Sequence, residues 1–145
     1  MNSLESCYTR WSPYLLSVLR IMTAALFVEH GGQKLLGFPP GGMHVPLFTF
    51  MGFGGALELL GGILLLIGLG ARPVAFILSG EMAVAYFLAH APHSFFPVNN
   101  HGELAVLYCF VFLYLAIAGG GPIGLDVLFR RKARAAMPCN AESMT

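Results

Sequence analysis

The sequence has few charged residues for its length, and this scarcity excludes most soluble folds. Charged types make up 10% of the 145 residues, whereas hydrophobic types make up 57%. A soluble domain usually carries about 25% charged residues, which cover its water-facing surface. A chain with so little charge has little water-facing surface, and we therefore expect most of it to lie in a lipid bilayer.

The sequence also lacks a basic surface, a disulfide framework and a metal-binding motif. A net charge of +1 excludes a nucleic-acid partner, which needs a concentrated basic face. The one basic run, residues 130–134, follows the last apolar segment directly, as a topology signal or a contact with anionic lipid would. The three cysteines form no CxxC pair, and the histidines show no HxxxH or HExxH spacing, so no metal site is predicted.

Four long apolar segments are present instead, each separated from the next by glycine and proline. Each is long enough to cross a hydrocarbon core about 30 Å thick as a helix. The predicted helices cover about residues 12–36, 47–69, 73–91 and 103–119. We therefore expect an all-α membrane protein whose domain, residues 12–121, is a bundle of four transmembrane helices, with tails at 1–11 and 122–145.

The positions of lysine and arginine predict how this bundle is oriented. Arg10, Arg72 and the cluster Arg130–Arg134 lie before the first helix, in the second loop and after the fourth helix. With four spans these three places share one side of the membrane, which the positive-inside rule makes the cytoplasmic side. Both tails are therefore predicted to be cytoplasmic.

Three ionisable residues lie inside the predicted spans, where charge is costly and often functional. Counting from the cytoplasmic helix ends at about 1.5 Å per residue places Arg20, Glu58 and Glu81 at similar depth. This depth predicts that Arg20 pairs with Glu58, with Glu81 or with both. A seven-residue repeat, Gly54, Gly61 and Gly68, is predicted to pack against another helix and turns Glu58 inward. The charges either clamp the helices together or form a proton relay or polar ligand site.

A second group of polar residues is predicted at the opposite ends of the helices, where all five histidines fall. Histidine and glutamate can act as proton donors and acceptors toward a quinone carbonyl. They can also ligate a haem iron or a metal ion, although the spacing of these residues fits that alternative less well. They can also simply cap helix ends and contact lipid headgroups. The candidate ligand-binding residues are His30, Lys34, His90, His101 and Glu103.

The chain resembles the DoxX family of small bacterial membrane proteins. The resemblance rests on His-Gly-x-x-Lys-Leu at His30–Leu35, on Glu58 within GGALELLGG, and on His101-Gly102-Glu103, and it covers roughly Arg20 to Asp126. It implies a four-helix bundle in the bacterial cytoplasmic membrane, similar to subunits of quinone-linked oxidoreductases or to partners in oxidant-defence complexes. The sequence reads Ile-Gly-Leu-Asp where the family usually has Trp-Ser-Leu-Asp, which leaves the role of Asp126 open.

These observations favour one functional hypothesis over two others. The first is a multi-pass inner-membrane subunit of a quinone-linked redox system, which binds a small ligand near the periplasmic face and has an oxidoreductase partner. The second is a small-solute transporter or permease, which would require a homo-oligomer. The third is a scaffold without chemistry of its own that anchors a partner oxidoreductase. Whether the chain is itself catalytic stays open.

Overall fold

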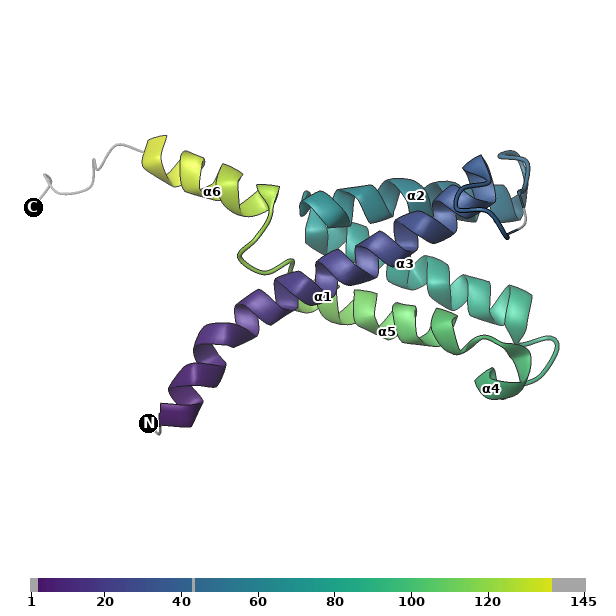
Figure 1. Cartoon of the computed structure of the whole chain (residues 1–145), viewed down its shortest axis with the longest axis horizontal. Helices are drawn as coiled ribbons and strands as arrows, with labels where there is room; N and C mark the ends of the chain where they lie inside the picture. The colour runs from purple at the N-terminus through teal and green to yellow at the C-terminus, as the bar shows by residue number, and fades with distance from the viewer. Residues whose placement is uncertain (1–2, 43, 137–145) are drawn as a thin grey trace, which may run out of the picture.

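The computed structural model describes residues 3–42 and 44–136, and it contains helices and no β-strand over those residues (Figure 1). The helices are α1 (Ser3–Leu36), α2 (Phe50–Ile67), α3 (Ala71–Ala85), the π-helix η1 (Tyr86–His90), α4 (Pro97–Asn100), α5 (Glu103–Ala118) and α6 (Leu125–Ala136). The all-helical fold class predicted from the sequence is confirmed.

Three helical segments are long and apolar enough to cross a membrane: Glu5–Leu36, Phe50–Ile67 and Ala71–His90. The fourth apolar helix, α5, has 16 residues. At 1.5 Å per residue it is about 24 Å long, which is shorter than a hydrocarbon core of about 30 Å.

The helices run up and down in chain order, with α1 packed on α2, α2 on α3, and α3 on α5. The start of α1 and the whole of α6 lie at one end of the bundle, which we call the terminal end (Figure 1). Residues 37–42 and 44–49, between α1 and α2, and the short helix α4 lie at the other end, which we call the loop end. Both described ends of the chain therefore lie on the same side of the bundle.

Two rows of glycine on α2 bring both neighbouring helices close. A Cβ atom added at Gly61 would lie 2.7 Å from Leu78 of α3, and one added at Gly54 would lie 3.3 Å from the Glu81 carboxylate of the same helix. Each of these glycines is followed directly by a second glycine, Gly55 or Gly62, that faces α1. The predicted packing of the glycine repeat is confirmed for Gly54 and Gly61, because small residues let backbones approach.

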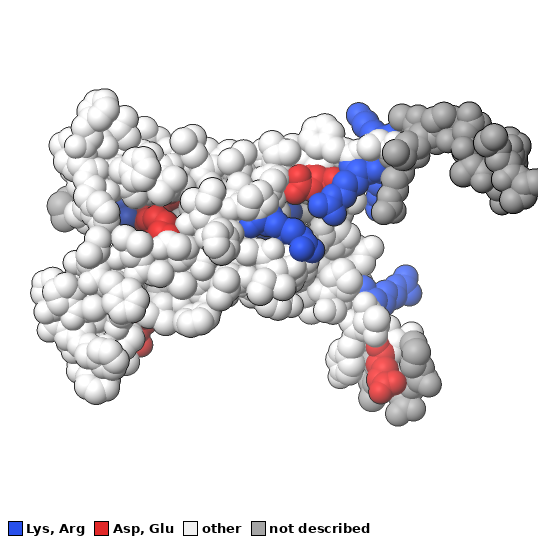
Figure 2. All heavy atoms as spheres, turned by 180° about the vertical axis from the view of Figure 1, so that it is seen from behind, with Lys and Arg blue, Asp and Glu red and all other residues white. Residues whose placement is uncertain are grey.

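Aromatic rings fill the centre of the bundle, and apolar side chains cover its outside. Phe27 of α1 contacts Tyr108 and Phe112 of α5, with ring centroids 5.3 and 4.8 Å apart. Large apolar side chains are exposed along the outer faces, among them Leu15, Met22, Leu26, Leu60, Phe76, Leu107, Phe110 and Ile117. Figure 2 shows a broad surface without charge between the two ends, as contact with lipid tails requires.

The helix boundaries differ most from the predicted ones in α1, in α6 and at the end of α3. α1 begins at Ser3 and not near residue 12, α6 lies within the predicted tail 122–145, and the third predicted helix changes to a π-helix at Tyr86. Hydropathy marks where a helix meets lipid and not where its hydrogen bonds end, so polar extensions are missed. Most of the predicted tail beyond residue 134 lies outside the described residues.

Candidate functional site

An ion pair joins α1 to α2 near the loop end. The ammonium of Lys34 lies 2.5 Å from Oε1 of Glu58, whose side chain is 3% exposed while that of Lys34 is 30% exposed. Glu58 points into the bundle, as predicted from the glycine repeat. Its second oxygen, Oε2, is buried and has no hydrogen-bond partner within the described residues. A buried acceptor without a donor is costly, which makes this carboxylate a candidate for contact with a ligand.

Glu81 of α3 brings a second carboxylate to the same place. Its Oε1 lies against Gly54, one helical turn from Glu58 on α2, and the charges of Glu58 and Lys34 both act on it. Its Oε2 is also buried without a partner within the described residues. Three helices therefore supply one ammonium and two carboxyl groups, and we call Lys34, Glu58 and Glu81 the polar trio.

Arg20 is not part of this group, so its predicted pairing with Glu58 or Glu81 is wrong. Arg20 is 2% exposed, but its guanidinium donates to the carbonyl of Ile123 at 2.7 Å and lies against Gly68. The depth prediction assumed that residues 12 and 69, the cytoplasmic ends of the first two predicted helices, lie at the same level. α1 instead extends past the bundle, which brings Arg20 level with Gly68. On α2, Glu58 is about 15 Å away from Gly68 at 1.5 Å per residue.

A cavity of about 230 Å³ lies on the α5 side of the polar trio, and we call it the inner cavity. Its lining includes four of the five predicted ligand-binding residues: His30, Lys34, His90 and His101. Glu103 is exposed and does not line it. The remaining histidines, His44 and His93, are exposed at the loop end and also stay outside it. The fold thus brings predicted ligand-binding side chains from α1, η1 and the α4–α5 turn together around the inner cavity.

A second cavity of about 440 Å³ lies between α2 and α3, and we call it the lateral cavity. Lys34, Glu81 and His90 form its polar end. Apolar side chains form the rest, namely Phe50, Met51, Phe53, Leu57, Ile77, Val84, Ala85 and Ala89, with Gly54 and Gly80. Lys34, Ala85 and His90 line both cavities, so the two are neighbours across the polar trio. Sequence inspection missed the lateral cavity because its walls look like ordinary lipid-facing residues.

The π-helix η1 is what turns His90 toward Glu81. These residues are nine apart, and at about 100° per residue an uninterrupted α-helix would place them on opposite faces. The wider π-turn is closed by the hydrogen bond from the Ala91 amide to the Tyr86 carbonyl at 2.9 Å. It rotates about the helix axis by a smaller angle per residue than an α-helix does. Both side chains therefore line the lateral cavity. π-Turns inside α-helices occur often at functional sites.

Asn100 holds the ring of His90 in place. Nδ1 of His90 lies 3.0 Å from the Asn100 carbonyl, which can only accept, so Nδ1 carries the proton and Nε2 of the neutral ring is an acceptor. The Asn100 side chain is itself fixed, because it donates to the Ser94 carbonyl and accepts from the Gly102 amide. His101 follows with a left-handed φ of 56°, a conformation that costs a non-glycine residue energy and that recurs at binding sites.

Asp126, whose role the sequence leaves open, caps the start of α3. Its two carboxylate oxygens accept hydrogen bonds from the amides of Gly70 and Ala71 at 2.9 and 3.1 Å. A carboxylate at a helix N-terminus satisfies amides that lack a partner and favours the helix dipole. Asp126 thereby ties the start of α6 to the α2–α3 turn at the terminal end.

The donor set of the site suits an organic ligand with polar oxygens. Over residues 3–42 and 44–136, no three His, Cys, Asp or Glu side chains converge as metal ligands. Lys34 has N–H groups beyond the one that Glu58 accepts, and two carboxylate oxygens are unpartnered in the same part of the chain. These groups can donate to and accept from the oxygens of a small polar ligand.

Comparison with known proteins agrees with the resemblance found in the sequence. The DoxX family matches residues 15–91, a stretch that holds Lys34, Glu58, Glu81 and His90. A Haemophilus influenzae protein described as an uncharacterized protein is 44% identical over 138 residues, which cover 91% of this chain and 100% of the relative. No solved structure matches the chain. The match spans more than half of the sequence, and the chain belongs to the DoxX family.

Proposed function

We propose that this protein is a four-span protein of the bacterial inner membrane that binds a quinone at the polar trio and acts as the membrane subunit of a redox system. The electrons come from a partner oxidoreductase, and this chain supplies the binding site and the groups that exchange protons with the ligand. The observation that carries the proposal is the lateral cavity, which has a charged polar end and apolar walls.

The distribution of charge supports a four-span topology with both ends of the chain in the cytoplasm. Most of the blue Lys and Arg atoms in Figure 2 gather toward the terminal end, whereas one small blue and red patch lies toward the loop end. Arg10, Arg72 and Arg130 belong to segments that meet at the terminal end. With this end cytoplasmic under the positive-inside rule, the polar trio lies nearer the periplasmic face.

The shape of the lateral cavity supports a ligand that arrives from the bilayer. Its volume of about 440 Å³ is in the range of small-molecule sites. Its walls include Phe53 and Ile77, which are 63% and 55% exposed on the outer surface of α2 and α3. A ring with an apolar tail can enter between these helices and place its oxygens at the polar trio, while the tail stays in lipid.

The polar end can satisfy a quinone in both of its redox states. A quinone carbonyl needs a donor, which Lys34 provides through N–H groups that Glu58 does not use. A quinol hydroxyl needs an acceptor, and Nε2 of His90 and Oε2 of Glu81 are suitable. Reduction of a quinone to a quinol takes two electrons from the partner and two protons, which these acceptors can hold and exchange.

Filling the lateral cavity tests the proposal. Gly80 lines this cavity, and a Cβ atom added there would meet nothing within 4 Å, so a larger side chain can start toward the cavity without a clash at its first atom. We expect wild-type protein purified in mild detergent to retain quinone that solvent extraction and mass analysis detect. Gly80→Phe should lose most of it. The double variant His30→Ala/His101→Ala should lose it too, because both side chains line the inner cavity, which shares Lys34, Ala85 and His90 with the lateral cavity.

Leu107→Phe is the matched control, because Leu107 is 60% exposed on α5 and lines neither cavity. It adds a comparable aromatic ring to the lipid-facing surface and should leave quinone occupancy unchanged. Equal quinone content in wild type, Gly80→Phe and the double histidine variant would refute the assignment, as would wild-type protein without any bound quinone.

A further inference from the structure

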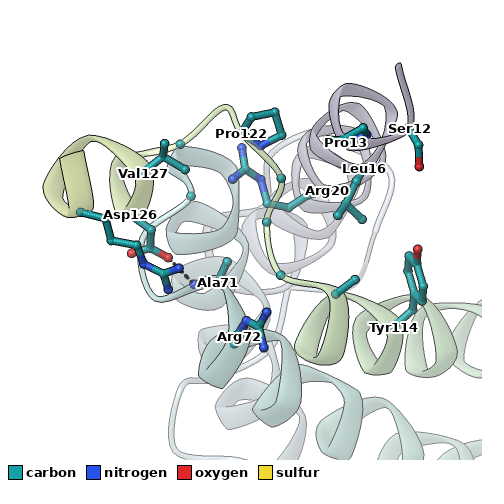
Figure 3. Close-up of a pocket in the computed structure, with 17 residues that line it drawn as sticks. Ser12, Pro13, Leu16, Arg20, Ala71, Arg72, Tyr114, Pro122, Asp126 and Val127 are labelled. Carbon is teal, nitrogen blue, oxygen red and sulfur yellow. Dashed lines mark hydrogen bonds between the residues drawn. The ribbon is translucent and has the colours of Figure 1, made fainter. Parts of the chain in front are cut away.

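The terminal end holds a separate cavity of about 480 Å³ that collects arginine side chains from three helices. Arg20 comes from α1 and Arg72 from α3 (Figure 3), and Arg130 comes from α6. Leu16 of α1 and Tyr114 of α5 form its opposite wall. We call this space the arginine cavity. Nothing in the proposed quinone function uses it.

The positive side chains that line this cavity outnumber its negative ones. Its one acidic residue, Asp126, already uses both oxygens on the amides of Gly70 and Ala71. None of the three arginines forms an ion pair within 4.0 Å with another of the described residues. Three cations against one carboxylate leave two positive charges without a counter-charge.

Arg20 points to a ligand most directly, because it is buried and mostly unpartnered. It is 2% exposed, yet its guanidinium makes one hydrogen bond, to Ile123, and its Nε has no partner in the described structure. A guanidinium has five N–H donors and is costly to bury without acceptors. Glycine makes room for it: a Cβ at Gly120 or Gly124 would lie 2.9 or 2.7 Å from Nη1.

The other two arginines are exposed and free to close on a ligand. Arg72 and Arg130 have no hydrogen-bond or ion-pair partner among the residues that the structure describes. Arg20 and Arg72 line the same cavity from different helices (Figure 3). Guanidinium groups that converge from several helices suit an anion with several oxygens, above all phosphate, which arginine binds through paired N–H groups.

We infer that the arginine cavity binds a phosphate group, and that its source is the headgroup of an anionic phospholipid. Trp11 and Tyr14 pack together at this end with ring centroids 6.1 Å apart, and both are exposed. With Tyr114, which lines the cavity, they match the aromatic belt that lies at the level of lipid headgroups. Pro13, Leu16 and Ala118 also line the cavity and give it apolar surface that an acyl chain could contact.

Lipid binding to delipidated protein in a neutral detergent tests this inference independently of quinone content. Native mass spectrometry and thermal unfolding would be measured with added phosphatidylglycerol, phosphatidylcholine or free glycerol 3-phosphate. We expect phosphatidylglycerol to bind and stabilise the protein more than phosphatidylcholine does. The double variant Arg72→Gln/Arg130→Gln should weaken this binding about 30-fold, on the scale of attraction per basic residue at an anionic surface.

The double variant Arg131→Gln/Lys132→Gln is the matched control, because it removes the same charge from α6 outside the arginine cavity. It should weaken phosphatidylglycerol binding much less. Arg72 and Arg130 are exposed, so their variants should fold, and Arg72→Gln alone provides a milder test. If glycerol 3-phosphate stabilises as well as the lipid, the phosphate site stands and its source is soluble. Equal loss in both double variants, or no loss in either, overturns the proposal.

Discussion

Lys34 is the residue at which the structural and the functional hypotheses for the charged groups meet. Its ammonium lies 2.5 Å from Glu58 and lines both the inner and the lateral cavity. A carboxylate buried in an apolar environment needs a cation, so Lys34 stabilises the contact of α1 with α2. The same ammonium has N–H groups left for a ligand oxygen. A clamp and a ligand contact are therefore compatible in this side chain.

Replacement of Lys34 should separate these two roles. Lys34→Met leaves the Glu58 carboxylate without its cation, and we expect the free energy of unfolding in detergent micelles to fall by about 2 kcal/mol. This is less than for a fully buried pair, because the Lys34 side chain is 30% exposed. The double variant Lys34→Met/Glu58→Leu should regain most of the lost free energy of unfolding. Quinone occupancy should stay low in both the single and the double variant.

Lys132→Met is the control, because Lys132 is exposed and has no partner within the described residues. Its stability should equal that of the wild type. If the losses of Lys34→Met and Glu58→Leu simply add in the double variant, the two residues are not coupled. If the double variant instead regains stability and keeps its quinone, the pair is a clamp alone.

At the scale of the helices, glycine contacts decide how α1 lies along α2. A Cβ at Gly31 would lie 2.7 Å from the Gly55 carbonyl oxygen, and one at Gly62 would lie 3.2 Å from that of Ala24. These contacts involve backbone atoms, which cannot rotate away as a side chain can. They set the register that brings Lys34 opposite Glu58 and leaves Arg20 at the level of Gly68.

Two glycine-to-alanine changes should therefore differ in their effect on stability. Gly31→Ala places a methyl group against the backbone of α2, and we expect a loss of about 2 kcal/mol, in the range of overpacked cores. Gly80→Ala adds the same methyl group in open space and should be neutral or stabilise by up to about 1 kcal/mol through helix propensity. Unfolding of both variants in mixed micelles measures the difference. Equal effects would contradict the assigned α1–α2 contact.

For the whole molecule, the asymmetry of charge between the two ends predicts its orientation. Basic side chains gather toward the terminal end, where α1 begins and α6 lies (Figures 1 and 2). Moving basic residues across the membrane is unfavourable, so this end should stay in the cytoplasm. The polar trio and both cavities beside it then lie toward the periplasm.

Labelling of single cysteines with a membrane-impermeant maleimide checks this orientation. In a background without Cys109 and Cys139, the exposed Cys7 should react only after the cells are lysed. His93→Cys, placed at an exposed position of the loop end in a chain that also lacks Cys7, should react in intact spheroplasts. Lysed membranes are the control in which both cysteines react. Labelling of Cys7 in intact spheroplasts would reverse the assigned topology.

The general character of the site was predictable, because it depends on which residue types fall in apolar segments. Charge is too costly in lipid to occur there without a purpose, so Glu58, Glu81 and the histidines stand out in the sequence. Helix periodicity also sufficed to turn Glu58 inward beside its glycines. The exposed Glu103 shows the limit of that reasoning, because a polar residue in the first turn of a helix has water or headgroups within reach.

Composition and the order of apolar segments thus determined, without any structure, that the chain is helical and suited to a membrane. Tertiary structure alone decided that Lys34 and not Arg20 pairs with Glu58. The sliding of one helix along another depends on backbone contacts at glycines, and counting residues from an assumed membrane boundary does not reveal it. The same holds for His90, because only the π-turn that follows α3 rotates its ring to the face of Glu81.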